Sequence, residues 1–278
     1  MNLQTGQQLE GWKATAINTA HESENKIHDN DVARQYGFEG GLVPGVTIHG
    51  YMVRPAVDAL GRDWLERGTF STRFVKPFYE GEEVSVRGTV TRADEDRAEI
   101  ELEALNPAGT VCAIATATLS ATAPERPGLR DFPVAPLPAV RPMVSTSVLE
   151  AIDILGTVDQ PWERIREDEN FLQEIQDDHA FYRGVGAVLH PGYLIRWANT
   201  ALSANVQLGP WIHVSSEVQH HSTVAVGEGF STRGRVIELF ERKGHRFVVL
   251  DVLQVSGERP VARIRHTAIY DVRKVAGS

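Results

Sequence analysis

Two apolar segments of helical length stand out along the chain, at residues 44–61 and 191–209. Each begins with a Pro-Gly pair and ends at a glycine, and each is apolar on nearly every side of a helical projection. A helix that is apolar all round has no face suited to water, so most of its surface must be covered. The pattern therefore predicts two long buried helices.

A different periodicity follows each of these segments. Residues 78–90 read FYEGEEVSVRGTV and residues 224–236 read VAVGEGFSTRGRV, with glycines at matching places. Further alternating stretches, at 100–104 and 248–255, are accompanied by turn sequences such as NPAG and SGER. A period of two predicts β-strands with one buried face, and the short turns predict antiparallel pairing.

The two halves of the chain follow one plan. The Pro-Gly pairs lie 147 residues apart and the strand segments 146 residues apart, so a one-residue insertion or deletion is expected between them. Features that recur at one offset indicate an internal repeat. A sheet wrapped around one helix is the hotdog arrangement, so the predicted fold class is α+β, a double hotdog. We expect an N-terminal hotdog domain with the candidate active site at 1–122, a proline-rich linker at 123–142, and a C-terminal hotdog domain with a degenerate site at 143–278.

Charge and composition limit the function classes. The 278 residues carry a formal net charge of −9, which argues against nonspecific binding to nucleic acid or to an anionic membrane. The one cysteine, Cys112, leaves no intrachain disulfide, and the sequence contains no metal-binding motif. Neither a signal-like segment nor an apolar run of membrane-spanning length is present, so a cytoplasmic protein is expected.

A polar loop precedes the first apolar segment. It reads ESENKIHD at residues 22–29 and is followed by GGLVPGV at 40–46. A neutral histidine such as His28 can take up and return a proton near pH 7. A helix that starts at Gly45 offers free backbone N–H groups to a developing negative charge. The structural alternatives are a histidine that bonds locally or caps a short helix, and a Pro-Gly pair that only starts a packed helix.

These residues resemble the MaoC-like (R)-specific enoyl-CoA hydratase and dehydratase family. The family loop G-D-x-N-P-x-H-x-D is similar to residues 22–29, and its R-P-I-x-H-G-M helix start to residues 40–46. Its F-x-x-P-V-x-x-G-D segment is similar to RFVKPFYEGEE at 73–83, so the resemblance covers most of the N-terminal half. It implies that His28 acts on water and that the Gly45 N–H binds a thioester oxygen.

The loop departs from the family pattern at three places, one of which is the loss of the residue between the family His and Asp, which shifts His28 relative to Asp29. Ser23 stands where the family has a catalytic aspartate, so a neighbouring carboxylate, Glu24 or Glu22, is expected to assist instead. Pro44 replaces the histidine before the oxyanion glycine, and His49 follows about one turn into the helix. The predicted site therefore has no metal and consists of the catalytic residues His28, Glu24 and Gly45 and the substrate-binding residues Ser23, Asn25, Val46 and His49.

The resemblance implies a hydratase or dehydratase for 2-enoyl or 3-hydroxyacyl thioesters in fatty acid metabolism. The thioester, on coenzyme A or an acyl carrier protein, would be the substrate, and no cofactor is expected. Arg73, Lys76 and Arg87 are either contacts for coenzyme A phosphates or solvated strand charges. One alternative is an acyl-CoA thioesterase of the same fold, in which Glu24 attacks or directs water. A non-catalytic acyl-thioester-binding protein is the other, and a homo-oligomer of double hotdog units is expected.

The second half reads as a copy that has lost the site. Aligning the two Pro-Gly pairs sets Ile175 against His28, so the polar constellation is expected in the first half alone. Residues 210–221, PWIHVSSEVQHH, carry three histidines and predict a strand at the face where the two halves meet.

Overall fold

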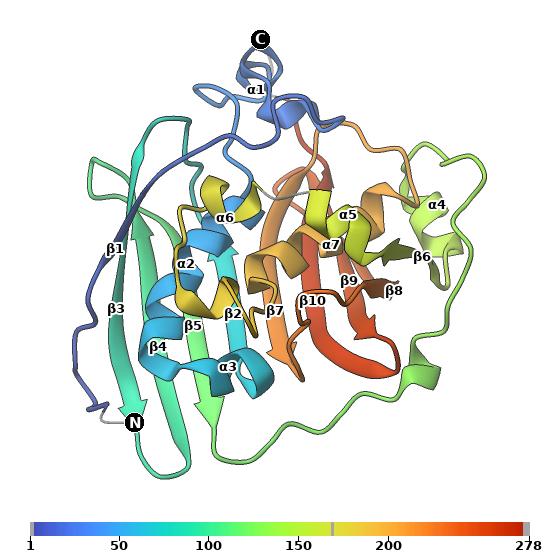
Figure 1. The fold of residues 1–278 in the computed structure, drawn as a ribbon. Helices are drawn as coiled ribbons and strands as arrows, with labels where there is room; N and C mark the ends of the chain where they lie inside the picture. Colours follow the sequence, from blue (N-terminus) through green and yellow to red (C-terminus); the bar gives the residue numbers. More distant parts are fainter. Residues whose placement is uncertain (1–2, 168–169, 275–278) are drawn as a thin grey trace.

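The computed structural model describes residues 3–167 and 170–274, and one antiparallel sheet dominates it (Figure 1). Ten strands in these ranges are ordered β1-β3-β4-β5-β2-β7-β10-β9-β8-β6 across the sheet. The strands are β1 Trp12–Thr15, β2 Thr69–Phe74, β3 Glu83–Ala93, β4 Arg97–Leu105, β5 Val111–Ser120, β6 Leu155–Gln160, β7 Ile212–His220, β8 Phe230–Arg242, β9 His245–Ser256 and β10 Arg259–Asp271.

Two long helices, α2 (Gly45–Leu60) and α7 (Pro191–Ser203), lie next to each other against one side of the sheet (Figure 1). Both were predicted from their apolar patterns. The shorter helices and turns are η1 Lys26–His28, α1 Asn30–Arg34, α3 Arg62–Arg67, η2 Leu129–Asp131, α4 Thr146–Ala151, α5 Trp162–Glu167, α6 Phe171–Glu174 and η3 Ala180–Tyr182. Within the described ranges, no helix is long and apolar enough to cross a membrane.

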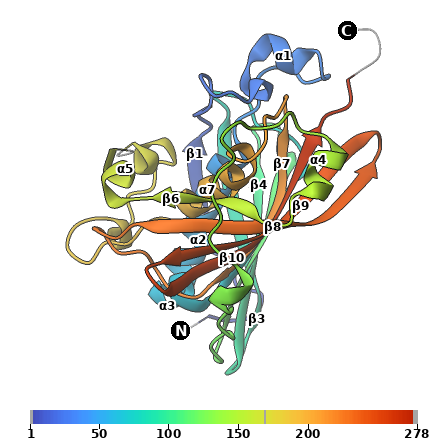
Figure 2. The same cartoon turned by 90° about the vertical axis from the view of Figure 1, so that its right-hand side faces the viewer.

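The sheet is continuous because the two halves pair edge to edge. Strand β2 of the first half pairs with β7 of the second, with Thr69 opposite Gln219 and Arg73 opposite Ser215. Outward from this junction the order is β5, β4, β3, β1 on one side and β10, β9, β8, β6 on the other. Figure 2 shows the strong twist that results, since β3 runs nearly upright and β8 nearly level in that view. The predicted double hotdog, with a strand from 210–221 at the junction, is confirmed.

The two long helices approach each other closely at a pair of glycines. A Cβ built on Gly192 would lie 3.1 Å from the Cα of Gly50, and one on Gly50 would lie 2.8 Å from the Ile175 side chain. A side chain on Gly192 would push the two backbones apart, and one on Gly50 would displace Ile175, so the two glycines permit this close crossing. The two hotdog halves are therefore joined through their central helices as well as through the sheet.

The register between the halves differs from the one predicted from the Pro-Gly pairs. Pro44 is the N-cap of α2, whereas His190 is the N-cap of α7, so Pro44 corresponds to His190 and not to Pro191. The offset is then 146 residues here as well as in the strands. The expected one-residue insertion or deletion is therefore wrong, because a proline can stand either at the N-cap or at the first position of a helix.

The polar loop also has a counterpart in the second half. The turns η1 and η3 share a cap in which the N-cap side chain accepts a hydrogen bond from the N–H two residues on. His28 and Tyr182 end these turns and correspond to each other, as do Ser23 and Asp177, which lie five residues earlier. The predicted pairing of Ile175 with His28 is wrong, because the first half carries α1 and eight extra residues between the turn and its long helix.

Candidate active site

A cavity of about 470 Å³ lies where the two halves meet. The first half contributes Asn25, His28 and Gly45 to its lining, and the chain entering β7 contributes Trp211 and His213. No Asp or Glu is among the described residues that line it. Apolar side chains form much of the remaining wall, among them Ile27, Leu42, Ile48, Phe74, Phe78 and Phe247. A mostly apolar cavity with a few polar groups is the usual form of a small-molecule site.

Both ring nitrogens of His28 have partners. Nδ1 lies 2.7 Å from the carbonyl oxygen of Leu42 and donates its proton there, and Nε2 lies 3.2 Å from the amide nitrogen of Asn25. The Asn25 side chain also bonds the backbone of Trp211, donating to its oxygen at 2.9 Å and accepting from its nitrogen at 3.1 Å. Burial lowers the pKa of His28, although the Leu42 carbonyl opposes this. His28 is therefore neutral near pH 7, with its lone pair on Nε2.

The first long helix begins without a side-chain cap. Its N-cap is Pro44, which has no hydrogen-bonding side chain, and Gly45 is the first helical residue. The Gly45 N–H has no acceptor within the helix, because the first N–H groups of a helix point beyond it. A Cβ on Gly45 would lie 2.9 Å from the Phe74 ring and 3.0 Å from Nδ1 of His213. In the described part of the chain the Gly45 N–H makes no hydrogen bond, so the cavity contains an unpaired donor at the positive end of a helix dipole, at a position where a Cβ would displace two side chains.

The structure does not bring Glu24 to the cavity. Its two carboxylate oxygens lie 2.9 and 3.0 Å from the guanidinium of Arg141, and its side chain is 77% exposed. The hydrogen bonds from Arg141 lower the pKa of Glu24. The Ser23 hydroxyl donates to the backbone oxygen of Asn25 at 3.3 Å. Glu24 and Ser23 both lie outside the lining, so neither meets His28 there.

Val46 and His49 lie on α2 but also outside the cavity lining. Val46 packs into the hydrophobic core. Nδ1 of His49 lies 3.0 Å from the Thr72 hydroxyl, and its ring meets Phe70 edge to face. Burial lowers the pKa of His49 to about 3, so it is a neutral core histidine. Of the seven predicted site residues, the cavity gathers three: Asn25, His28 and Gly45.

Four exposed basic side chains also belong to the cavity lining, namely Arg73, Lys76, Arg242 and Lys243. In the described part of the chain, no ion pair neutralises any of them. Arg87, by contrast, forms an ion pair with Glu103 at 2.7 Å. On a chain with a net charge of −9, this cluster is a local positive region suited to phosphate groups.

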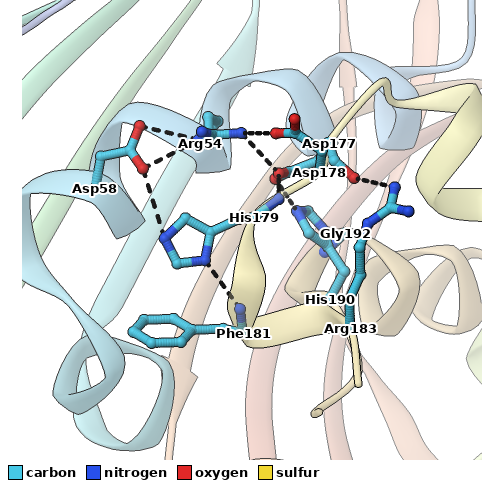
Figure 3. A network of polar contacts seen from close by, with 9 residues as sticks. All are labelled: Arg54, Asp58, Asp177, Asp178, His179, Phe181, Arg183, His190 and Gly192. Atoms are coloured by element: carbon cyan, nitrogen blue, oxygen red, sulfur yellow. Dashed lines mark hydrogen bonds and ion pairs between the residues drawn. The ribbon is translucent and has the colours of Figure 1, made fainter. Parts of the chain in front are cut away.

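The start of the second long helix is closed by its own cap (Figure 3). Nδ1 of His190 accepts a hydrogen bond from the Gly192 N–H at 2.9 Å, and Nε2 lies 3.3 Å from Asp177. Both side chains are 1% exposed, and Arg54 of α2 reaches Asp177 at 3.2 Å. Burial lowers the pKa of His190, although Asp177 opposes this. The prediction of a polar constellation in the first half alone is therefore wrong, because the second half carries a buried one.

Sequence reasoning did not place His213 at the cavity. The strand was expected at the junction, but its histidines were assigned to that interface rather than to the site. His213 lines the cavity and stands against Gly45 of the other half. The contact that links His213 to the polar loop is visible only in the structure: Asn25 binds the backbone of Trp211, two residues before His213.

No family model and no curated protein sequence matches this chain. Solved structures match it over nearly its whole length. A protein from Chloroflexus aurantiacus, provisionally assigned as a MaoC-domain dehydratase, aligns with a TM-score of 0.64 at 13% identity over 98% of this chain and 97% of its own. A conserved protein from Mycobacterium tuberculosis, described as a double hotdog, gives 0.61 at 16% identity over 96% and 97%.

A third similar structure, provisionally assigned as an oleoyl thioesterase from Lactobacillus plantarum, gives a TM-score of 0.57 at 11% identity over 97% of this chain and 98% of its own. At such identities the shared property is the fold. The chain is therefore a double hotdog protein, and the structures similar to it include ones named as dehydratases and ones named as thioesterases.

Proposed function

We propose that this protein is a hydratase or dehydratase of 2-enoyl and 3-hydroxyacyl thioesters. One observation carries the proposal: a single cavity combines a neutral histidine, His28, with the free N–H of Gly45 at a helix start. The reaction needs both groups, because water must lose a proton while negative charge gathers on the thioester oxygen.

The Gly45 N–H would bind the thioester oxygen. Addition of water at the β-carbon turns the thioester into an enolate, whose negative charge lies largely on that oxygen. A backbone donor at the positive end of a helix dipole stabilises this charge more than it stabilises the neutral carbonyl. Such a difference between ground state and transition state is what accelerates a reaction.

His28 would move the proton. Nε2 takes a proton from water as the water oxygen bonds to the β-carbon, and the resulting imidazolium returns a proton to the α-carbon of the enolate. The Nδ1–H bond to Leu42 keeps Nε2 as the acceptor, and the Asn25 amide N–H that Nε2 accepts in the free protein must give way to the substrate water. Since the described lining offers no carboxylate, His28 is assigned both transfers, and neither Glu24 nor Glu22 takes part in this proposal.

The carrier would meet the basic cluster. Arg73, Lys76, Arg242 and Lys243 are exposed and form no ion pair within residues 3–167 and 170–274, and phosphate groups of coenzyme A or of a carrier-bound pantetheine match them in charge. The apolar wall suits the acyl chain. The dehydratases and thioesterases among the similar structures support a thioester substrate.

The test is a paired assay on the purified protein. Crotonyl-CoA and 2-hexenoyl-CoA are followed for loss of enoyl absorbance, and the matching saturated acyl-CoA esters for release of free thiol. We expect loss of enoyl absorbance, reduced at least 100-fold in His28→Ala, because general acid–base catalysis contributes about 10²- to 10⁴-fold. His21→Ala is the matched control, since His21 lies in the same loop but pairs with Glu80 outside the cavity lining.

The possible outcomes of the two measurements, enoyl absorbance and thiol release, lead to different conclusions. Release of free thiol would replace the hydratase with a thioesterase. Tight thioester binding without turnover in either channel would favour a non-catalytic binder. Full activity in His28→Ala would remove His28 from the mechanism.

A further inference from the structure

His213 is a buried histidine with an unused nitrogen beside the helix start. This residue of the second half lines the cavity and is only 6% exposed to solvent. Nδ1 has no hydrogen-bond partner in the described part of the chain. The same atom lies 3.0 Å from the position that a Cβ on Gly45 would occupy. The unused nitrogen and the free Gly45 N–H therefore border the same small region of the cavity.

The other nitrogen of His213 is held by a chain of hydrogen bonds. Nε2 lies 2.8 Å from the Ser216 hydroxyl, which lies 2.9 Å from Nδ1 of His266. The rings of His213 and His266 stack with centroids 4.3 Å apart. Nε2 of His266 is buried and has no partner among the described residues. The Ser216 hydroxyl proton and one proton on each neutral imidazole can be placed along these hydrogen bonds in two ways, which run in opposite directions.

The burial of His266 decides between the two arrangements. In either arrangement one ring N–H has no acceptor among the described residues, on Nε2 of His266 in one and on Nδ1 of His213 in the other. His266 is fully buried and does not line the cavity, whereas His213 does, so only the N–H of His213 can be satisfied by a ligand oxygen. Nε2 of His266 is therefore the bare nitrogen, and Nδ1 carries the proton. Nδ1 of His266 then donates to Ser216, and the Ser216 hydroxyl donates to Nε2 of His213. The proton of His213 must therefore sit on Nδ1, directed at the cavity beside Gly45.

We propose that the Nδ1–H of His213 is the second donor to the thioester oxygen, beside the N–H of Gly45. This inference rests on the function proposed above and adds a catalytic residue to it. It also assigns the second half a direct role, because β2 and β7 pair across the junction and bring His213 to the helix start of the first half. Burial keeps the ring neutral, so the site gains a donor without a buried charge.

The test compares two substitutions at this position in the whole chain. His213→Phe keeps a ring but removes the donor, whereas His213→Asn places an amide N–H near the position of Nδ1. Loss of one oxyanion donor costs about 10²- to 10³-fold in kcat. We expect kcat on 2-hexenoyl-CoA to fall about 100-fold in His213→Phe with KM changed far less, and to recover in part in His213→Asn.

The matched control is His220→Phe. His220 lies on the same strand, is equally buried, and meets Trp64 outside the cavity lining, so its replacement should leave kcat unchanged. If the wild type turns over substrate and His213→Phe keeps its kcat, the role of His213 is overturned and the proposed function stands. A wild type without thioester turnover overturns the proposed function and this role together.

Nitrogen NMR of the wild type gives a second readout that needs no variant to fold. With ¹⁵N-labelled histidine, the Nδ1 signal of His213 should be that of a protonated nitrogen and should shift when 3-hydroxyhexanoyl-CoA is added. A bare Nδ1, or a signal unmoved by bound ligand, contradicts the proposal.

Discussion

The two long helices begin at equivalent places and end up in opposite states. The N-cap of α2 is Pro44, which leaves the Gly45 N–H free and open to a cavity. The N-cap of α7 is His190, whose ring accepts the Gly192 N–H and reaches a buried Asp177. One fold therefore yields an open helix start in one half and a closed one in the other. The identity of the N-cap residue decides which, because only a side chain with an acceptor can satisfy the first N–H groups.

The largest effect is expected where the closed helix start is opened. His190→Leu removes the cap and leaves Asp177 buried with Arg54 as its nearest cation. His190 is neutral, because burial lowers its pKa, and the ion pair of Asp177 with Arg54 remains. Loss of an N-cap costs about 1 kcal/mol and a less well satisfied buried polar group about 1–3 kcal/mol more, so the free energy of unfolding in urea should drop by about 2–4 kcal/mol. His190→Asn, which keeps a capping acceptor, should lose less. A loss below about 1 kcal/mol in His190→Leu would mean that the cap is not a structural device.

At the open helix start, the sharpest change is Gly45→Ala. The added Cβ would stand 2.9 Å from the Phe74 ring and 3.0 Å from His213, so it displaces the wall that faces the thioester oxygen. We expect kcat to fall about 100-fold, which corresponds to about 2.7 kcal/mol. Pro191→Ala, at the equivalent position of α7, is the control and should retain activity. Equal activity losses in the two variants would show that the helix start at Gly45 contributes no more to activity than the one at Pro191.

The pH dependence of activity tests the state of His28. The proposed reaction needs His28 in its neutral, basic form, and burial lowers the pKa of His28 below the ordinary 6.5. The value of kcat/KM should therefore hold as pH falls through 6.5, and should decline about tenfold per pH unit only below the lowered pKa. Steady-state rates on 2-hexenoyl-CoA measure this profile. An acid limb centred at or above pH 6.5 would contradict a buried neutral His28.

The smallest expected effect comes from giving the first helix a cap. Pro44→Ser supplies a hydroxyl that can accept from the first turn, and a good N-cap stabilises a protein by about 1 kcal/mol. The same hydroxyl competes with substrate for the helix start, so activity should fall, by about tenfold. Urea unfolding and enoyl-CoA turnover, measured on one preparation, should move in opposite directions. A variant that gains stability and keeps full activity would show that the free helix start is not used.

The fold could be predicted because its signals are local and repeated. Two apolar helical segments and two sets of alternating strands recur along the chain, and burial of such patterns admits few arrangements. The register could not be read from the Pro-Gly pairs, because Pro44 stands at the N-cap of its helix and Pro191 inside the first turn of the other. A sequence match between prolines therefore does not guarantee a structural one.

The candidate site could be predicted only in part. His28, Asn25 and Gly45 line the cavity, and they could be proposed from the sequence because they belong to a continuous loop and helix start with a recognisable spacing. Glu24 was expected at the site but lies outside the cavity lining, because a loop residue can face either way and Arg141, 117 positions later, binds it there. His213 was missed, because its place beside Gly45 depends on the pairing of β2 with β7, which no local pattern encodes.

The most direct measurement is a crystal structure of the protein with 3-hydroxyhexanoyl-CoA bound. We predict one ligand per chain, in the cavity between the halves. Its thioester oxygen should lie within about 3 Å of the Gly45 nitrogen and of Nδ1 of His213, and its 3-hydroxyl should be near Nε2 of His28. A thioester bound at the start of α7, or one whose oxygen contacts neither donor, would show that the start of α2 is not the oxyanion site.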